Sequence, residues 1–193
     1  MADGKEIGYR VQLAGMAADP FTLLGLSPAF ELNADEVQRR YLERAARLHP
    51  DVAAAGSGGR ATDVSDVADS AAILNDARAV LADPEKRASA LLTLLGGPGS
   101  DQEKSLPVGF LLEIMEVREG VEQAARTRDP GKMSEWHRWA RARRAEYIGE
   151  VGAKFRHLLA LPAEGRSEPA LVDVRRVLNA WRYIERLRDQ LEG

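Results

Sequence analysis

Apolar residues recur at spacings of three and four through most of the chain, from residue 19 to the C-terminus. This spacing places them on one face of an α-helix, and the alternating pattern typical of strands is absent from the sequence. Proline and glycine residues, which stop helices, divide the pattern into segments. We therefore predict an all-α fold with helices at residues 20–25, 33–48, 63–81, 84–95, 107–128, 131–161 and 168–191.

The segment Gly96-Gly97-Pro98-Gly99 is the strongest interruption of this pattern. Clusters of this kind mark turns and domain boundaries. We predict an N-terminal extension at 1–18, an N-terminal domain at 19–97, a linker at 98–106 and a C-terminal domain at 107–193. Three long helices with short breaks fit an antiparallel three-helix bundle in the C-terminal domain.

Helical spacing also predicts which side chains are buried. The helix at 84–95 is expected to bury Ala88, Leu91, Leu92, Leu94 and Leu95. Large aromatic side chains belong more often to a core than to a functional site. The same expectation therefore holds for Trp136, Trp139 and Trp181.

The helix at 107–128 carries two apolar faces. One stripe holds Phe110, Ile114, Val117 and Val121, which suffices to face a bundle core. A second sector holds Val108, Leu111, Leu112 and Met115, with acidic residues such as Glu116 and Glu119 along its border. The second sector either packs against another part of this chain or forms a docking surface for a protein. Tyr183, off the apolar stripe of the last helix, is a candidate extension of that surface.

Composition narrows the functional classes. The 193-residue chain has 45% apolar and 30% charged residues, the balance of an ordinary globular protein. A net charge of −3 gives no indication of nucleic-acid binding. The lack of cysteine excludes disulfides, thiolate metal sites and a cysteine nucleophile, and it suits a cytoplasmic location. We expect no membrane span, no signal peptide, no metal site and no cofactor.

The tripeptide His49-Pro50-Asp51 follows a basic helix and precedes a glycine-rich run at 53–59. Pro50 fixes its own φ and moves His49 out of the helical region, so the tripeptide is expected at the tip between two helices. Four arginines give the preceding helix a positive face: Arg39, Arg40, Arg44 and Arg47.

These features resemble the J-domain, the module of DnaJ-type co-chaperones, whose signature is a His-Pro-Asp loop after a basic helix. The C-terminal part narrows the resemblance to the HscB family, the specialised J-proteins of iron–sulfur cluster assembly. The segments that are similar to HscB are Asp19-Pro20-Phe21-Thr22-Leu23-Leu24-Gly25-Leu26, Ser70-Ala71-Ala72-Ile73-Leu74-Asn75-Asp76-Ala77 and Phe110-Leu111-Leu112-Glu113-Ile114-Met115-Glu116-Val117-Arg118-Glu119. The N-terminal domain at 19–97 is accordingly identified as a J-domain.

The resemblance implies a co-chaperone that stimulates the ATPase of a DnaK/HscA-class chaperone and delivers an IscU-type scaffold protein to it. The positions implied in chaperone binding are Arg39, Arg40, Arg44, Arg47, His49, Pro50 and Asp51. The positions implied in client binding are Leu111, Leu112, Met115, Glu116, Glu119 and Tyr183.

Two other functions stay open at this level. A general J-domain co-chaperone would bind a different client, or a second copy of itself as a homodimer, through the C-terminal bundle. An enzyme would use His49 or His137 as a base, but the sequence offers no third catalytic group, phosphate loop or metal-ligand cluster to support it. We therefore expect the chain not to be an enzyme.

Overall fold

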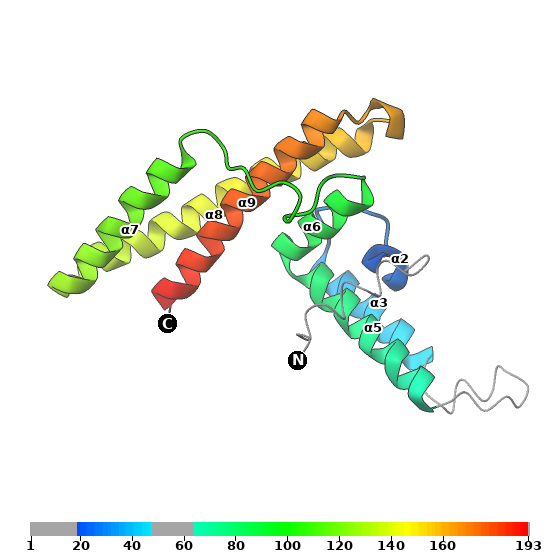
Figure 1. The fold of residues 1–193 in the computed structure, drawn as a ribbon. Helices are drawn as coiled ribbons and strands as arrows, with labels where there is room; N and C mark the ends of the chain where they lie inside the picture. Colours follow the sequence, from blue (N-terminus) through cyan, green and yellow to red (C-terminus); the bar gives the residue numbers. More distant parts are fainter. Residues whose placement is uncertain (1–18, 48–63, 193) are drawn as a thin grey trace, which may run out of the picture. The chain divides into compact units, whose positions relative to one another are not determined.

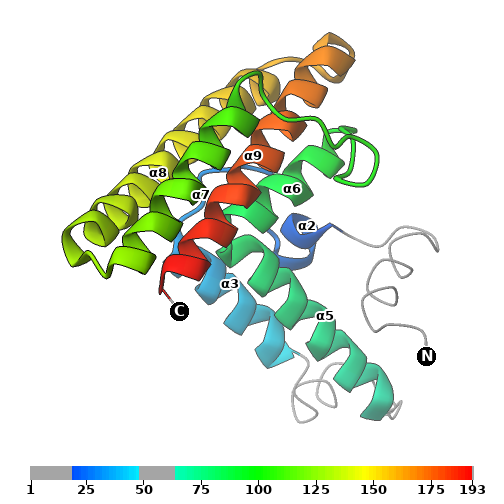
Figure 2. The same ribbon diagram turned by 60° about the vertical axis from the view of Figure 1, so that its left-hand side comes forward.

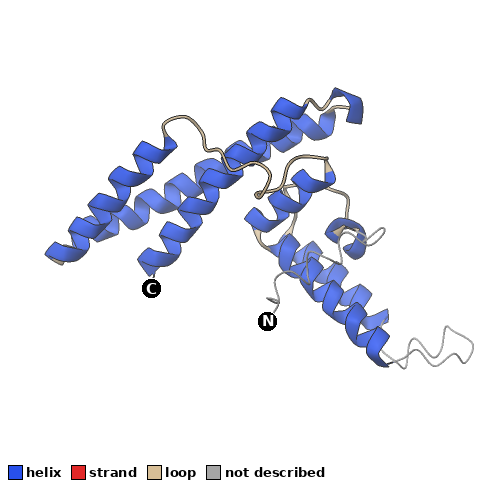
Figure 3. Ribbon diagram, in the orientation of Figure 1, coloured by secondary structure: helices blue, strands red, loops and turns tan. Residues whose placement is uncertain are grey.

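The computed structural model describes residues 19–47 and 64–192, and all the regular structure in these ranges is helical (Figures 1 and 3). This confirms the predicted all-α class. The elements in chain order are α2 (Pro20–Leu24), α3 (Ala34–Arg47), α5 (Val64–Ala82), α6 (Pro84–Leu94), α7 (Phe110–Thr127), α8 (Pro130–Ala160), the 3₁₀ turn η1 (Ala163–Gly165) and α9 (Glu168–Glu192). Within the described ranges, none of these helices is long and apolar enough to cross a membrane.

The chain forms two compact units, which are described separately. One unit is Met1–Pro28 with Leu32–Asp83, and the other is Ala29–Glu31 with Pro84–Gly193. The second unit therefore begins at α6, earlier in the chain than the linker predicted at 98–106. Because segment 29–31 lies between two parts of the first unit, the division does not follow chain order.

The short helix α2 is bounded by local contacts at both ends. The Asp19 carboxylate accepts hydrogen bonds from the backbone N–H groups of Phe21 and Thr22, at 2.9 and 3.0 Å. Gly25 ends the helix with a left-handed φ of 68°, a conformation that costs glycine little. Phe21 and Leu24 are fully buried, so this single turn of helix contributes to the core of the first unit.

Helix α3 is capped by Asn33, the first residue of the predicted range 33–48, and it packs along α5. The Asn33 side-chain oxygen accepts from the N–H groups of Asp35 and Glu36, at 2.8 and 3.2 Å. Between the two helices, the Tyr41 hydroxyl donates to Asn75 at 2.8 Å, and the guanidinium of Arg78 lies 5.1 Å from the Tyr41 ring centre. These polar contacts on the half-buried side of the pair add to the apolar packing between α3 and α5.

The second unit has a bundle in which α8 packs against both α7 and α9 and α6 packs on α9 (Figure 2). Its core centres on Trp181 of α9, which is fully buried, as predicted. Phe30, which the sequence pattern did not single out, lies 5.8 Å from the Phe155 ring and 6.4 Å from the Trp181 ring. The segment 29–31 belongs to this unit because Phe30 fills part of its aromatic core.

The segment predicted as a linker is held by side chains of α9. The Asn179 amide donates to the backbone carbonyls of Glu103 and Ser105, both at 3.0 Å, and the Arg176 guanidinium donates to the Ser105 hydroxyl at 2.8 Å. Asn179 is buried, so these bonds are protected from water. Glycine and polar residues at 98–106 indicate a loop correctly, but an irregular loop can pack against its own unit.

Two burial predictions were wrong in part. Leu94 is 40% exposed and Leu95 is half-buried, although Ala88, Leu91 and Leu92 are buried as expected. Trp136 and Trp139 are half-buried, because they lie near one end of α8 where they pack edge to face against each other at 6.3 Å.

Gly120 of α7 permits a close approach of the Trp136 side chain of α8. A Cβ atom at this position would lie 2.2 Å from Cζ2 of the Trp136 ring. An indole ring is rigid, so only a shift of the ring or of the helices would accommodate a methyl group there. In contrast, a Cβ at Gly149 of α8 would meet no atom within 4 Å.

We expect Gly120→Ala to lower the free energy of unfolding by about 1–2 kcal/mol, because overpacking outweighs the gain in helix propensity. Gly149→Ala is the matched control and should raise it by up to about 1 kcal/mol. Urea unfolding followed by tryptophan fluorescence measures both, since all three tryptophans lie in the second unit. Equal stabilisation by the two substitutions would contradict the close approach.

Candidate functional site

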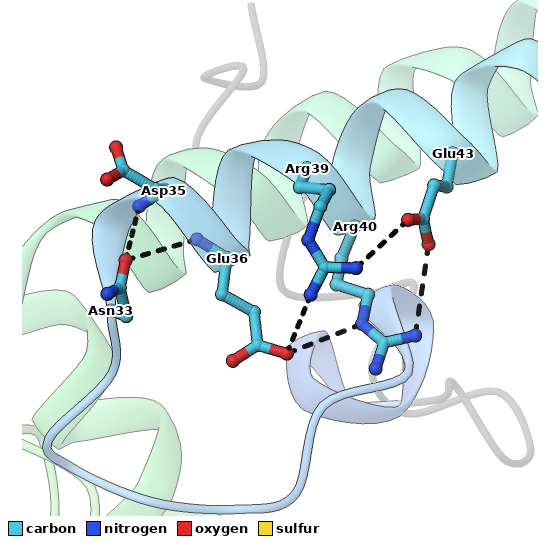
Figure 4. Close-up of polar contacts among 6 residues, drawn as sticks. All are labelled: Asn33, Asp35, Glu36, Arg39, Arg40 and Glu43. Atoms are coloured by element: carbon cyan, nitrogen blue, oxygen red, sulfur yellow. Dashed lines mark hydrogen bonds and ion pairs between the residues drawn. The ribbon is translucent and has the colours of Figure 1, made fainter.

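The basic helix α3 carries a lattice of ion pairs along its exposed side (Figure 4). Arg39 lies 3.3 Å from Glu36 and 3.2 Å from Glu43, and Arg40 contacts the same two carboxylates at 3.6 and 3.8 Å. Two of the four arginines are thus partly neutralised by carboxylates one turn before and after them. Glu43 stands among the arginines in the sequence, whereas the pairing of Glu36 with both Arg39 and Arg40 is visible only in the structure.

The other two arginines of α3 differ from this pair. Arg44 and Arg47 are exposed and form no ion pair with any residue that the structure describes. The Arg44 guanidinium lies over the end of α2, where a Cβ at Gly25 would be 2.6 Å from its Nη2 atom. The tripeptide His49-Pro50-Asp51 lies outside the described residues.

Helix α7 has the two faces that its sequence predicts. Phe110, Ile114 and Val117 are at most 5% exposed and belong to the core of the second unit. The second sector is 59–106% exposed, and we refer to its four residues as the apolar patch: Val108, Leu111, Leu112 and Met115. The last three lie on α7, whereas Val108, which was predicted on the helix, lies in the turn that precedes it. Within the second unit, therefore, no neighbouring helix covers this sector.

The border of the apolar patch is acidic. Glu116 and Glu119 are exposed, and neither forms an ion pair within the part of the chain that the structure describes. An apolar centre with a charged rim is the usual composition of a protein-binding surface. Exposed apolar surface of this kind on a folded unit marks a binding site more often than chance.

Tyr183 of α9 lies at the first turn of α7. It is half-buried, and its ring packs edge to face on Phe110 at 5.8 Å between centres. Phe110 also contacts Tyr147 of α8, at 6.4 Å. Because Phe110 directly precedes Leu111, these ring contacts hold in place the turn from which the apolar patch starts.

Arg143 of α8 fixes the other side of α7. Its guanidinium donates to Glu113 at 2.8 Å and to Glu146 at 2.7 Å, and it lies 4.9 Å from the centre of the Tyr147 ring. Together with the packing of Trp136 on Gly120, this contact sets the rotation of α7 about its own axis. Sequence reasoning missed Arg143, and its only signal is a charged residue on the half-buried border of an apolar stripe.

Burial raises the pKa of Tyr147 to about 12, and the nearby carboxylates of Glu113 and Glu150 act in the same direction. Arg143 opposes them, because a cation favours the phenolate. Burial tends to lower the pKa of Arg143, but its carboxylate partners outweigh burial and the net shift is upward. Arg143 therefore stays charged and Tyr147 stays neutral at physiological pH.

Among residues 19–47 and 64–192, no group of three histidine, aspartate or glutamate side chains is arranged to hold a metal ion.

Comparison with known proteins adds the following. Residues 106–192 match the family model described as the HSCB C-terminal oligomerisation domain. The chain is 30% identical to the co-chaperone protein HscB homolog of Paraburkholderia phytofirmans, over 93% of this chain and 98% of that protein. A similar protein from Paraburkholderia phymatum is 28% identical over the same shares.

Solved structures have the same fold. The chain superposes on chaperone HscB from Vibrio cholerae with a TM-score of 0.69 and 24% identity, covering 91% of this chain and 96% of that one. Human co-chaperone protein HscB gives a TM-score of 0.72 and 22% identity, covering 91% and 81%.

The pKa of Tyr147 leads to a prediction for alkaline pH. The folded state keeps the phenol proton up to about pH 12, whereas an ordinary tyrosine loses it near 10.0. Between these values the folded state binds more protons than the unfolded state, so this residue makes the protein less stable as pH rises. Tyr147→Phe should remove this contribution to the fall in stability at alkaline pH, because phenylalanine has no proton to lose. Phenolate absorbance of the wild type minus that of the variant should show a step near pH 12, and a step near pH 10 would contradict the assignment.

Proposed function

The chain belongs to the HscB family of co-chaperones, and from this we propose that it stimulates the ATPase of a DnaK/HscA-class chaperone and delivers an IscU-type scaffold protein to it. The observation that carries the proposal is the apolar patch with its acidic rim on α7, in the C-terminal region that matches the family model. Relatives of the chain are named as co-chaperones and not as enzymes, which supports an adaptor without chemistry of its own.

The scaffold would bind α7 through the apolar patch. Leu111, Leu112 and Met115 each expose more than half of their side chains, so a partner can remove substantial apolar area from water. Met115 is unbranched and adapts its shape to a partner. Unpaired Glu116 and Glu119 would add charge complementarity to a basic rim on the scaffold. Tyr183 would contribute the exposed part of its ring beside the first turn of the helix.

The ATPase would bind the J-domain, for which we keep the predicted range 19–97. In this proposal Arg39, Arg40, Arg44 and Arg47 meet an acidic surface of the chaperone, and His49, Pro50 and Asp51 supply the tip that stimulates hydrolysis. Exposed ion pairs like those of Arg39 and Arg40 contribute little to stability. Arg39 and Arg40 could therefore leave Glu36 and Glu43 and pair with an acidic residue of the chaperone at little cost in folding stability.

Holding both partners on one chain would raise their effective concentration toward each other. The chain would shift the chaperone toward its closed state only if it binds the two states of the ATPase with different affinity. Arginines that steer association lose their effect at high salt, so the on-rate for the ATPase should fall as ionic strength rises.

We predict that Leu112→Ala combined with Met115→Ala weakens binding to a purified IscU-type scaffold by at least about tenfold, because two exposed anchors of the interface are lost. Calorimetric titration measures the affinity. Leu94→Ala is the control, since it removes a 40% exposed leucine elsewhere in the same unit. Unchanged scaffold affinity in the double variant would favour a co-chaperone with another client.

We predict that Asp51→Asn reduces stimulation to the basal ATPase rate while scaffold affinity stays unchanged, because the amide cannot pair as strongly with a cation of the chaperone. Single-turnover ATP hydrolysis with the purified chaperone is the measurement. Asp101→Asn, at an exposed aspartate in the loop between α6 and α7, serves as a charge control. Full stimulation by the Asp51 variant would refute the proposed role of the loop.

A further inference from the structure

Two contacts fix the register between α7 and α8. Glu113 pairs with Arg143. About two helical turns further along α7, Gly120 packs against the Trp136 ring. The chain directions are opposite, since the later residue of α7 meets the earlier residue of α8. Positions that follow one another by three and four residues lie on one side of a helix. Between these two contacts the buried residues include Val117 of α7 and Ala140 of α8. The residues before them, Glu116 and Trp139, lie toward the more exposed side of the helix pair.

Glu116 lies midway between Glu113 and Gly120 in the sequence, and Trp139 lies midway between Trp136 and Arg143. Because the two helices run in opposite directions, this places Glu116 and Trp139 at the same level of the α7–α8 pair. Both side chains keep surface that a ligand can contact, because Glu116 is exposed and Trp139 is only half-buried. The indole of Trp139 therefore borders the apolar patch on the side where Glu116 forms the rim.

Trp139 is held as a rigid surface. Trp136 packs against it edge to face, with 6.3 Å between ring centres and an interplanar angle of 75°. Trp136 itself is seated on the glycine of α7, which leaves no room for a Cβ. A ring fixed in this way loses little conformational entropy when a ligand stacks on it.

Glu116 has a free carboxylate for a ligand. It forms no ion pair with the residues in the described ranges. Arg143, one turn from Trp139 on α8, forms its ion pairs with Glu113 and Glu146 instead. A fixed aromatic face beside an unpaired carboxylate suits a guanidinium or ammonium group. The ring attracts the cation over its face, and the carboxylate accepts its hydrogen bonds.

We propose that Trp139 and Glu116 form a subsite for one cationic side chain, arginine above all, of the protein that docks on the apolar patch. Arginine fits better than lysine, because its planar group can stack on the indole and still donate to the carboxylate. This inference rests on the proposed function, and it extends the docking surface from α7 onto α8. Trp139 would thus select partners whose apolar contact segment has a basic residue beside it.

The test uses the full chain and the purified IscU-type scaffold. Trp139→Leu keeps an apolar side chain but removes the ring face, and Glu116→Gln keeps the shape but removes the charge. Each should weaken binding by about 3- to 30-fold. The double variant should bind about as weakly as the weaker of the two single variants, because both side chains hold the same group. Glu164→Gln, an exposed glutamate after α8, is the control and should bind as the wild type.

The indole N–H signals in ¹H–¹⁵N spectra provide a second readout that depends less on folding. The Trp139 signal should shift when the scaffold is added. The Trp181 signal should not, because that indole is buried and donates to Glu185 at 2.7 Å. Glu116→Gln alters only an exposed side chain, so it tests the subsite even if Trp139→Leu perturbs packing.

The outcomes separate this inference from the function on which it rests. If the scaffold binds Trp139→Leu as tightly as the wild type, with no shift of the Trp139 signal, the subsite is wrong although the proposed function stands. If the effects of the two substitutions multiply in the double variant, the two side chains bind different groups and the shared subsite is wrong. If the scaffold does not bind the wild type at all, the proposed function fails and the subsite fails with it.

Discussion

The rotation of α7 about its own axis decides which of its two apolar faces is exposed. Two contacts with α8 fix that rotation: Gly120 receives the Trp136 ring, and Glu113 pairs with Arg143. With these in place the stripe that begins at Phe110 is buried, and the apolar patch points to solvent. A rotation of α7 would bury Leu111 and Leu112 and expose the stripe that begins at Phe110. The candidate docking surface therefore depends on both contacts.

Polar contacts of α9 order the chain before α7. Asn179 binds two carbonyls of the segment that enters α7, and Arg182 pairs with Glu85 of α6 at 2.9 Å. A buried amide with both donors satisfied stabilises the loop, and leaving those carbonyls without a partner would cost about 1–3 kcal/mol. The apolar patch is therefore carried by a helix whose start is tied to the core on one side by Phe110 and on the other by the loop.

Much of the fold could be predicted because the relevant signals are local. The predicted helices at 20–25 and 33–48 end and begin at residues whose type favours that role: Gly25 has a left-handed φ, and the Asn33 side chain caps its helix by hydrogen bonds. The two apolar sectors of α7 were predictable as well, because helical spacing alone separates them, whereas the sequence left open whether the second sector is covered. No local pattern encodes the half-burial of Trp136 and Trp139 or the packing of segment 98–106 on α9. Both depend on residues far away in the sequence.

The charges on α3 and α7 would contribute to binding in different ways. On α3, Arg39 and Arg40 already share two carboxylates, so a partner acid replaces an existing pair and gains little net energy. On α7, Glu116 and Glu119 have no cation to give up within the described residues, so a partner cation makes a new pair beside an apolar surface that it helps to dehydrate. Charge on α3 should therefore act mainly on the rate of association, whereas charge on α7 should act on the lifetime and the selectivity of the complex.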